Sequence, residues 1–325
     1  MNNNPLVSIA CLTYNHEKYI RDAINGFLIQ KTDFQIEIII HDDASTDNTA
    51  NIIREYEKKY PELIKPIYQN ENKYSKGIKP SPNYVWPKCS GKYIALCEGD
   101  DYWLDPFKLQ KQVNFLEVNN DFMLCFTNAR VIDKEGNIER NYLSGGCIEQ
   151  TYTHLDMPIS APTQTVLFRN SEIRSIPKSF QSALGGDTYL LVWLSKFGKI
   201  KYHNYVSAVY RDTGMGTWTS RSNFQKERHL FQTYYAILDI AEKNAKEGFI
   251  YRIFIRLVVM KKYASTNSDK LLILDLYNQI SDYLKIEKNS GRVSSSSYFR
   301  YKIILKFYFY IYSQFVQLKL KFLNL

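Results

Sequence analysis

The sequence has few cysteines and none of the cysteine patterns that mark a metal site or a disulfide framework. The five are Cys11, Cys89, Cys97, Cys125 and Cys147, with no CxxC pair and no Cys/His ligand spacing, which argues against a zinc-binding fold. Several lie in strand-like apolar runs, where a free cysteine acts as a small hydrophobic residue. An odd number of such thiols is typical of a reducing cytoplasm.

Long apolar runs are also missing. No stretch of 18 uncharged apolar residues exists, so a membrane-spanning helix is not expected. Residues 1–5 do not open a basic segment followed by an apolar one, so no signal peptide is expected either. We therefore expect a cytoplasmic protein.

Acidic residues are absent from the last part of the chain. Residues 298–325 contain five Lys or Arg and no Asp or Glu, which is +5 of the net charge of +9. The remainder is only mildly basic, so no nucleic-acid partner is expected. As a helix, this segment would place Lys302 and Lys306 on one face amid ten aromatic residues. Such a basic amphipathic tail is typical of binding at a membrane surface; packing on the preceding helices, or a dimer contact, is the alternative.

Apolar runs alternate with helical patterns in the first part of the chain. Strands are predicted at 6–13, 35–41, 63–68 and 92–97, and helices at 17–30, 48–60, 83–89 and 107–118. Thr46 or Asp47 would cap the second helix and Asp105 the fourth. This alternation predicts an α/β fold with a mostly parallel, doubly wound sheet flanked by helices.

The pattern changes beyond residue 121. Strands are predicted at 122–132, 163–169 and 199–210, with a helix at 187–197. Helical periodicity then dominates at 223–245, 249–264 and 269–286. We predict a catalytic α/β domain over 1–221, a helical extension over 222–287, a linker over 288–297 and the tail over 298–325.

Three carboxylates follow the strand predicted at 92–97. Glu98, Asp100 and Asp101 lie within four residues of one another. Clustered carboxylates repel unless a cation lies between them, and oxygen ligands suit Mg²⁺ or Mn²⁺. A solvated acidic turn is the alternative. However, residues 13–15 and 42–43 also fall at carboxyl ends of predicted parallel strands, where ligands bind in such sheets.

Four segments, at residues 7–15, 40–49, 91–101 and 185–187, together resemble the motifs of the family 2 inverting glycosyltransferases, which have the GT-A fold. The resemblance spans roughly residues 5–215. It implies transfer of a sugar from a nucleotide-sugar donor, most often a UDP-sugar, to a hydroxyl of a glycan or lipid-linked glycan. It also implies Mn²⁺ or Mg²⁺ as cofactor and a role in assembling a bacterial surface polysaccharide.

The resemblance assigns donor-binding roles to several residues. Those expected in the nucleotide pocket are Thr13, Tyr14 and Asn15, with Asp42 or Asp43 on the base. Asn83 matches an asparagine that precedes the metal-binding strand, and Lys76 or Lys79 takes the place of a basic residue near the donor.

The resemblance also assigns the metal ligands. Asp100 is the expected ligand, and Asp101 binds the metal directly or through water. Glu98 stands where the family has an Asp, so its side chain is one methylene longer.

Asp187 matches the catalytic base of the family. A carboxylate can accept the proton of an attacking hydroxyl, and attack opposite the diphosphate inverts the anomeric carbon, with no covalent intermediate. The alternative role for Asp187 is a plain helix N-cap.

One position departs from the family. Thr213 stands where many relatives have a histidine in a Tyr-Arg-x-His motif, and Gly214 and Gly216 follow in a loop that a bound donor would order. Trp218 either belongs to that loop or packs on the core. The five histidines, His16 among them, are scattered and are interpreted as structural or solvent-facing.

Two other functions remain open. A sugar-nucleotide nucleotidyltransferase has a related fold, but it would carry a Gly-rich basic loop after the first strand, where this chain has Thr13-Tyr14-Asn15-His16-Glu17. A non-catalytic module that binds glycans or membranes would not need Asp100 and Asp187.

Overall fold

The computed structural model describes residues 4–143, 148–214, 216, 218–290 and 301. The chain divides into two compact units. The first comprises residues 1–181 and 190–219, and the second comprises residues 182–189 and 220–325.

The first unit is built on one sheet of mixed direction. Its strands are β1 (Val7–Thr13), β2 (Ile36–Asp42), β3 (Ile64–Tyr68), β4 (Tyr93–Glu98), β5 (Tyr102–Trp103), β6 (Phe122–Asp133), β7 (Ile138–Arg140), β8 (Gln150–Tyr152), β9 (Leu167–Arg169) and β10 (Lys199–Asp212). Their order is β3-β2-β1-β4-β9-β6-β10-β5, with β7 on β6 and β8 on β10.

Strands β3, β2, β1 and β4 are parallel, as the alternating pattern predicts. Beyond β4 the direction mixes: β9 runs antiparallel to β4 and β6, while β6 and β10 are parallel to each other. Because β2 and β4 lie on opposite sides of β1, the chain order reverses there. In open α/β sheets, ligands bind beyond the carboxyl ends of the strands at such a switch point.

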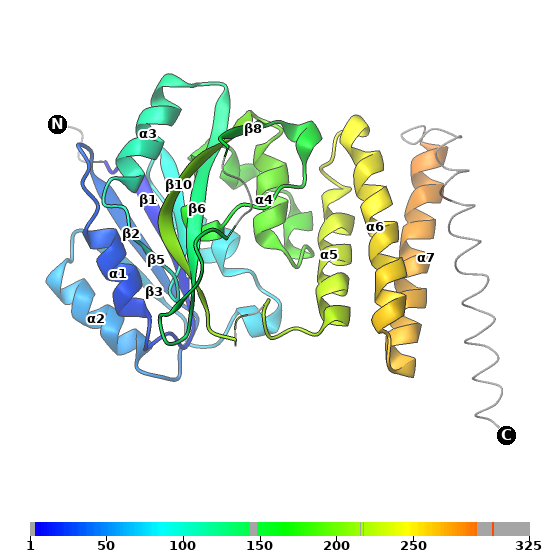
Figure 1. Ribbon diagram of the computed structural model, residues 1–325, viewed down its shortest axis with the longest axis horizontal. Coiled ribbons are helices and arrows are strands. Elements are labelled where there is room, and N and C mark those ends of the chain that lie inside the picture. Colours follow the sequence, from blue (N-terminus) through cyan, green and yellow to red (C-terminus); the bar gives the residue numbers. More distant parts are fainter. Residues whose placement is uncertain (1–3, 144–147, 215, 217, 291–300, 302–325) are drawn as a thin grey trace. The chain divides into compact units, whose positions relative to one another are not determined.

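The helices are α1 (Ile20–Leu28), α2 (Thr49–Lys59), α3 (Lys108–Val118), α4 (Gly186–Leu194), α5 (Asn223–Ile237), α6 (Lys243–Tyr263) and α7 (Asn267–Asn289) (Figure 1). Strand β1 is buried on both faces of the sheet: Val7, Ile9 and Cys11 are fully covered, and so is Ser8 between them. Burial on both sides explains why this strand reads as a continuous apolar run rather than an alternating one.

Two predictions about helices need correction. The helix predicted at 223–245 is two helices, because α5 ends at Ile237 and Glu242 precedes α6 in an extended conformation. The intervening Leu238 and Ile240 are buried, so apolar periodicity continues through a turn. The segment predicted as a helix at 83–89 is a short π-helix, η2 (Ser81–Val85), followed by a 3₁₀ turn, η3 (Trp86–Lys88).

The predicted helix caps also differ. The residue before α2 is Asn48, not Thr46 or Asp47, and Phe107, not Asp105, precedes α3. Both aspartates still accept a hydrogen bond from a nearby backbone N–H: Asp47 from Thr49 and Asp105 from Phe107.

The second unit holds the helices α5, α6 and α7, which lie side by side (Figure 1). Most of the predicted linker and nearly all of the predicted tail fall outside the described residues. Tyr301 is the exception: it is buried, its ring stacks on Phe254 of α6, and its hydroxyl donates to the carbonyl of Glu247. At this position the chain packs on α6. No helix in the described part of the chain has the length and apolar character needed to cross a membrane.

Candidate functional site

The turns after β1 and β2 are joined to each other by hydrogen bonds. The backbone N–H of Asn15 donates to Ser45 Oγ at 2.9 Å, and Asn15 Oδ1 accepts the N–H of Thr46 at 2.8 Å. Asn15 and Ala44 both have positive φ, +56° and +61°, a region that side-chain-bearing residues seldom adopt. Such backbone strain is often kept at functional sites.

Asp42 and Asp43, the two candidates for binding the base, order different loops. Asp42 accepts both the N–H and the hydroxyl of Ser45. The two carboxylate oxygens of Asp43 accept the N–H groups of Lys73 and Tyr74 at 2.9 Å each. Both side chains are buried, and each carboxylate keeps free lone pairs that could accept an N–H group of the nucleotide base. The choice between them stays a prediction.

The acidic turn after β4 packs directly on the turn after β1. Gly99 N–H donates to the carbonyl of Leu12 at 2.8 Å. A Cβ at Gly99 would lie 2.8 Å from Thr13 Oγ1 and 3.0 Å from His16 Nδ1, so glycine is needed for this close approach. Thr13 Oγ1 and His16 Nδ1 are themselves buried and have no hydrogen-bond partner among the described residues.

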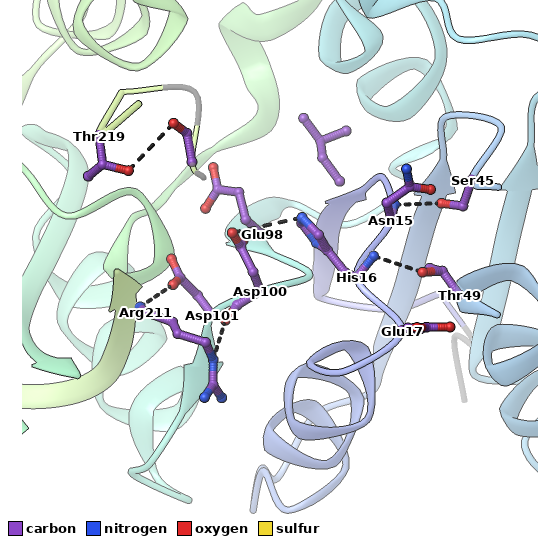
Figure 2. Close-up of polar contacts among 12 residues, drawn as sticks. Asn15, His16, Glu17, Ser45, Thr49, Glu98, Asp100, Asp101, Arg211 and Thr219 are labelled. Atoms are coloured by element: carbon purple, nitrogen blue, oxygen red, sulfur yellow. Dashed lines mark hydrogen bonds and ion pairs between the residues drawn. The ribbon is translucent and has the colours of Figure 1, made fainter. Parts of the chain in front are cut away.

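His16 lies beside the predicted metal ligand. Its Nε2 is 3.8 Å from Asp100 Oδ2, and its backbone N–H donates to Thr49 Oγ1 (Figure 2). Both side chains are about one-fifth exposed. The sequence interpretation of His16 as merely structural or solvent-facing therefore misses a contact with the acidic turn. Its position immediately after Thr13-Tyr14-Asn15 is the signal that points to it.

Arg211 of β10 holds Asp101 in place. Asp101 Oδ1 accepts the backbone N–H of Arg211 at 2.8 Å, and the Arg211 guanidinium donates to the Asp100 carbonyl (Figure 2). The guanidinium also donates to Asp22 of α1. Burial, followed by the charges of Asp100 and Glu98, raises the pKa of Asp101 well above its ordinary value. Arg211 thus ties the acidic turn to β10 and to α1, a role the sequence does not reveal.

The carboxylates of the acidic turn fit a divalent ion for which the protein supplies only some of the ligands. Among residues 4–143, 148–214, 216, 218–290 and 301, no group of three His, Cys, Asp or Glu side chains is arranged to hold a metal by itself. Ions such as Mg²⁺ are commonly bound by one or two carboxylates together with substrate phosphates. Asp100, with Glu98 close by in sequence and half-buried like it, provides that kind of incomplete set.

Asn83 lines a groove in the first unit, and Lys79 contacts two residues that line it, Asn83 and Phe180. Asn83 Nδ2 donates to the Lys79 carbonyl at 2.7 Å, and Lys79 N–H donates to Gln181 Oε1 at 3.4 Å. The Lys79 ammonium lies 4.6 Å from the centre of the Phe180 ring. Tyr84, next to Asn83, stacks on His41, which precedes Asp42. Lys79 and Asn83 are therefore connected to the carboxyl end of β2 through Tyr84. Lys76, the alternative basic residue, pairs with Glu71.

Asp187 lies in the first turn of α4, within the second unit. The helix begins at Gly186, so Asp187 is not the residue before the helix, as a plain N-cap would be. Its exposed carboxylate accepts the N–H of Thr188 at 2.7 Å. Gly185, just before it, donates its N–H to Thr233 Oγ1 at 2.7 Å, which anchors this turn to α5.

The segment after β10 begins at Thr213, the position where the sequence departs from the family pattern. Gly214 has a φ of +69°, and its N–H donates to Asp212 at 3.0 Å. Trp218 is 41% exposed, so it does not pack in the core. Thr219 Oγ1 donates to the carbonyl of Gly216 (Figure 2). Met215 and Thr217 lie outside the described residues.

Comparison with solved structures gives the class of the protein. The chain is similar to Staphylococcus aureus TarS 1–349 in complex with UDP-GlcNAc, with a TM-score of 0.58 and 18% identity over 86% of this chain and 80% of that one. It is also similar to the mannosyltransferase PcManGT of Pyrobaculum calidifontis in complex with GDP-Man and Mn²⁺, with a TM-score of 0.51 and 12% identity over 93% of this chain and 86% of that one. At these identities the likeness concerns the fold, which is that of the GT-A glycosyltransferases.

The family follows from the sequence. The model described as Glycosyl transferase family 2 matches residues 8–176, more than half of the chain. The chain belongs to this family and is a glycosyltransferase. An uncharacterized protein of Mycobacterium tuberculosis (strain ATCC 25618 / H37Rv) is 36% identical over 258 residues, which are 75% of this chain and 71% of that protein. Asp187 lies beyond the matched segment.

Proposed function

We propose that this glycosyltransferase moves a sugar, with inversion and with a divalent cation, from a nucleotide-sugar donor to a hydroxyl of a glycan or lipid-linked glycan. The observation that carries the proposal is the assembly of three turns, after β1, β2 and β4, at the switch point of the sheet. The nucleotide-sugar complexes of TarS and PcManGT support the donor class, and a UDP-sugar is the first to test.

The chain's own residues divide the work as follows. The turn formed by Thr13, Tyr14 and Asn15, with Asp42 or Asp43, binds the nucleoside. Lys79 and Asn83 belong to the donor side of the site.

Asp100 would hold Mn²⁺ or Mg²⁺ together with the donor diphosphate, with Glu98 beside it and Asp101 contributing through a water. The ion, when bound, stabilises the negative charge that develops on the leaving diphosphate. His16 positions the Asp100 carboxylate, and Arg211 holds the acidic turn in place.

Asp187 acts as the general base in this proposal. Its carboxylate is exposed, so an acceptor hydroxyl can reach it. It can then accept the proton of the acceptor hydroxyl as that oxygen attacks. General-base catalysis of this kind contributes about 10²–10⁴-fold in rate.

The test begins with donor binding. The thermal shift of the full chain is measured with UDP-, GDP- and dTDP-sugars, each with and without Mn²⁺ or Mg²⁺. We expect the nucleotide sugars of one base to stabilise the protein, and only when the cation is present. Stabilisation by no nucleotide sugar under any condition would refute the proposal. The anomeric configuration of the product, measured by NMR, then tests inversion.

The base is tested by Asp187→Asn, which keeps the acceptor for the Thr188 N–H. We expect transfer to fall about 10²–10⁴-fold while the donor-induced thermal shift is unchanged. Asp275→Asn, on the exposed surface of α7, is the matched control and keeps its rate. An Asp187→Asn protein that transfers at the wild-type rate rules out this role.

A further inference from the structure

A groove of about 600 Å³ crosses the first unit between the 82–87 segment and the 173–181 segment. Its apolar lining includes Trp86 and Phe180, which are nearly fully buried and pack against each other with ring centres 5.4 Å apart. Pro87 and Pro177 add to the lining. A rigid floor of aromatic and proline side chains suits a flat ring-shaped ligand, because little conformational entropy is lost on binding.

The charges of the groove are all of one sign. Among the residues that the structure describes, Arg174 and Lys178 line it and no Asp or Glu does. Both side chains are exposed, and neither has a hydrogen-bond or ion-pair partner among the described residues. The basic side chains of most neighbouring positions are already engaged: Lys92 pairs with Glu117, and Arg169 donates to backbone carbonyls. Arg174 and Lys178 are therefore available to a ligand.

Arg174 also lines a second hollow. This hollow, of about 540 Å³, is lined by Lys92, Arg169, Asn170, Ser171 and Arg174, again with no acid from the described part of the chain. Arg174 thus stands between two concave regions. A ligand that follows both must be elongated and must present negative charge at intervals.

We infer that this groove binds the acceptor, and that the acceptor is an anionic glycan carrying carboxylate or phosphate groups along its chain. The inference rests on the proposed function, since it names the acceptor of that reaction. Sugar rings would lie over the floor formed by Trp86 and Phe180 while Arg174 and Lys178 pair with the anionic groups. Asn83, which lines the groove and binds the Lys79 carbonyl, connects it to the donor side of the site. The recessed floor favours a single chain over a flat membrane surface.

The experiment measures binding without catalysis. Calorimetric titration of the full chain uses three probes: an octamer of galacturonic acid, maltooctaose as its neutral counterpart, and vesicles of phosphatidylglycerol. The variant is Arg174→Ala/Lys178→Ala, and the control Lys58→Ala/Arg140→Ala removes the same charge from exposed positions outside the groove. All four side chains are exposed, so we expect both proteins to fold.

We expect the octagalacturonate to bind wild type and the control equally, and to bind the groove variant about tenfold more weakly. Maltooctaose is expected to bind more weakly than octagalacturonate to wild type, and high ionic strength should reduce the difference. Equal binding of the two octamers, equal binding by the groove variant, or binding of vesicles in place of octagalacturonate would each overturn the inference.

Donor binding separates this inference from the proposed function. The same preparations are titrated with UDP and GDP in the presence of Mn²⁺. Wild-type protein that binds a nucleotide but no anionic glycan contradicts only the groove assignment. Wild-type protein that binds the glycan but no nucleotide contradicts the proposed function and leaves the groove as a glycan-binding site.

Discussion

Carboxylates are buried at both ends of strands β1, β2 and β4, but their surroundings differ. Hydrogen-bond donors surround the carboxylate at the amino ends, and further carboxylates lie beside the one at the carboxyl ends. At the amino ends, Glu37 is 2% exposed and accepts hydrogen bonds from Ser8 Oγ at 2.6 Å, Ser90 N–H at 2.7 Å and Lys65 Nζ at 2.6 Å. At the carboxyl ends, the buried Asp101 accepts the Arg211 N–H, and its neighbours in the turn are further carboxylates.

The pKa directions express this difference. Burial alone would raise the pKa of Glu37, but the hydrogen bonds from Lys65, Ser8 and Ser90 outweigh it and hold the pKa below 4.5. Burial and the charges of Asp100 and Glu98 raise that of Asp101. One end of the sheet satisfies its carboxylate internally and is structural. The other end gathers several carboxylates beside Arg211 and His16, and this crowding of negative charge supports the proposed binding of a divalent cation there.

The strongest test of the comparison is Asp100→Asn. It keeps the shape of the side chain and removes the charge that would hold the ion. We expect transfer to fall about 10²–10³-fold and the thermal stabilisation by Mn²⁺ with UDP to disappear. Asp33→Asn, on an exposed loop, is the control. Full stabilisation of Asp100→Asn by the cation would break the comparison, because the acidic turn would then not be the metal site.

The next test is at the opposite end. Glu37→Gln places an N–H₂ group where one carboxylate oxygen accepts hydrogen bonds, and it removes the charge opposite Lys65. We expect a loss of about 1–3 kcal/mol in the free energy of unfolding, measured by urea denaturation. Stabilisation by Mn²⁺ with UDP should be the same as in wild type. A Glu37→Gln protein that loses cation binding instead would show that the two ends are coupled.

The contribution of Glu37 also depends on pH in a defined direction. Its pKa is lower in the folded protein than the ordinary value of 4.5. The folded state therefore binds fewer protons than the unfolded one in this window, and the stabilisation is present above pH 4.5 and lost as the pH falls through the folded pKa. Urea denaturation of wild type and Glu37→Gln should give a constant difference above about pH 6 that shrinks below about pH 4. A difference that grows in acid has the wrong sign for this account.

The smallest effect is expected at Lys65. Its side chain is 51% exposed, so solvent screens its charge. Lys65→Met should cost about 0.2–1 kcal/mol, well below the effect of Glu37→Gln. A double-mutant cycle with Glu37→Gln measures the coupling between the two residues. A cost at Lys65 as large as that at Glu37 would mean that this one pair, rather than the serine hydroxyl and backbone donors, keeps Glu37 ionised.

Local pattern predicted much of the fold. Strands β1 to β4 begin and end within a residue or so of their predicted bounds. In β1, β2 and β4, burial on both faces leaves a continuous apolar run between polar turns. The prediction of a single helix over 223–245 was wrong, since the buried Leu238 and Ile240 continue the apolar spacing through the turn between α5 and α6. Periodicity records which residues are buried and does not record where the backbone leaves the helix.

The candidate site was predictable only in its parts. Thr13, Asp42 and Asp100 could be named because each lies at or just after the carboxyl end of a strand, and the order of the segments carries the family resemblance. Their roles in donor and metal binding stay predictions. The contacts of His16 with Asp100 and of Arg211 with Asp22 join residues 84 and 189 positions apart, and no local signal reports such distances. Glu37 was missed although a lone charge within an isoleucine run is a visible signal of a buried polar network.

The sequence by itself determined the alternation of strands and helices and the acidic turn, since each depends on residues close together in the chain. It also determined the family, through the order of four short segments. Only the tertiary structure decided which carboxylates are satisfied and which remain crowded, where Arg211 anchors the turn, and that Arg174 and Lys178 share a groove with Trp86. Burial and hydrogen bonding depend on which distant segments the fold brings into contact, and only the folded structure contains that information.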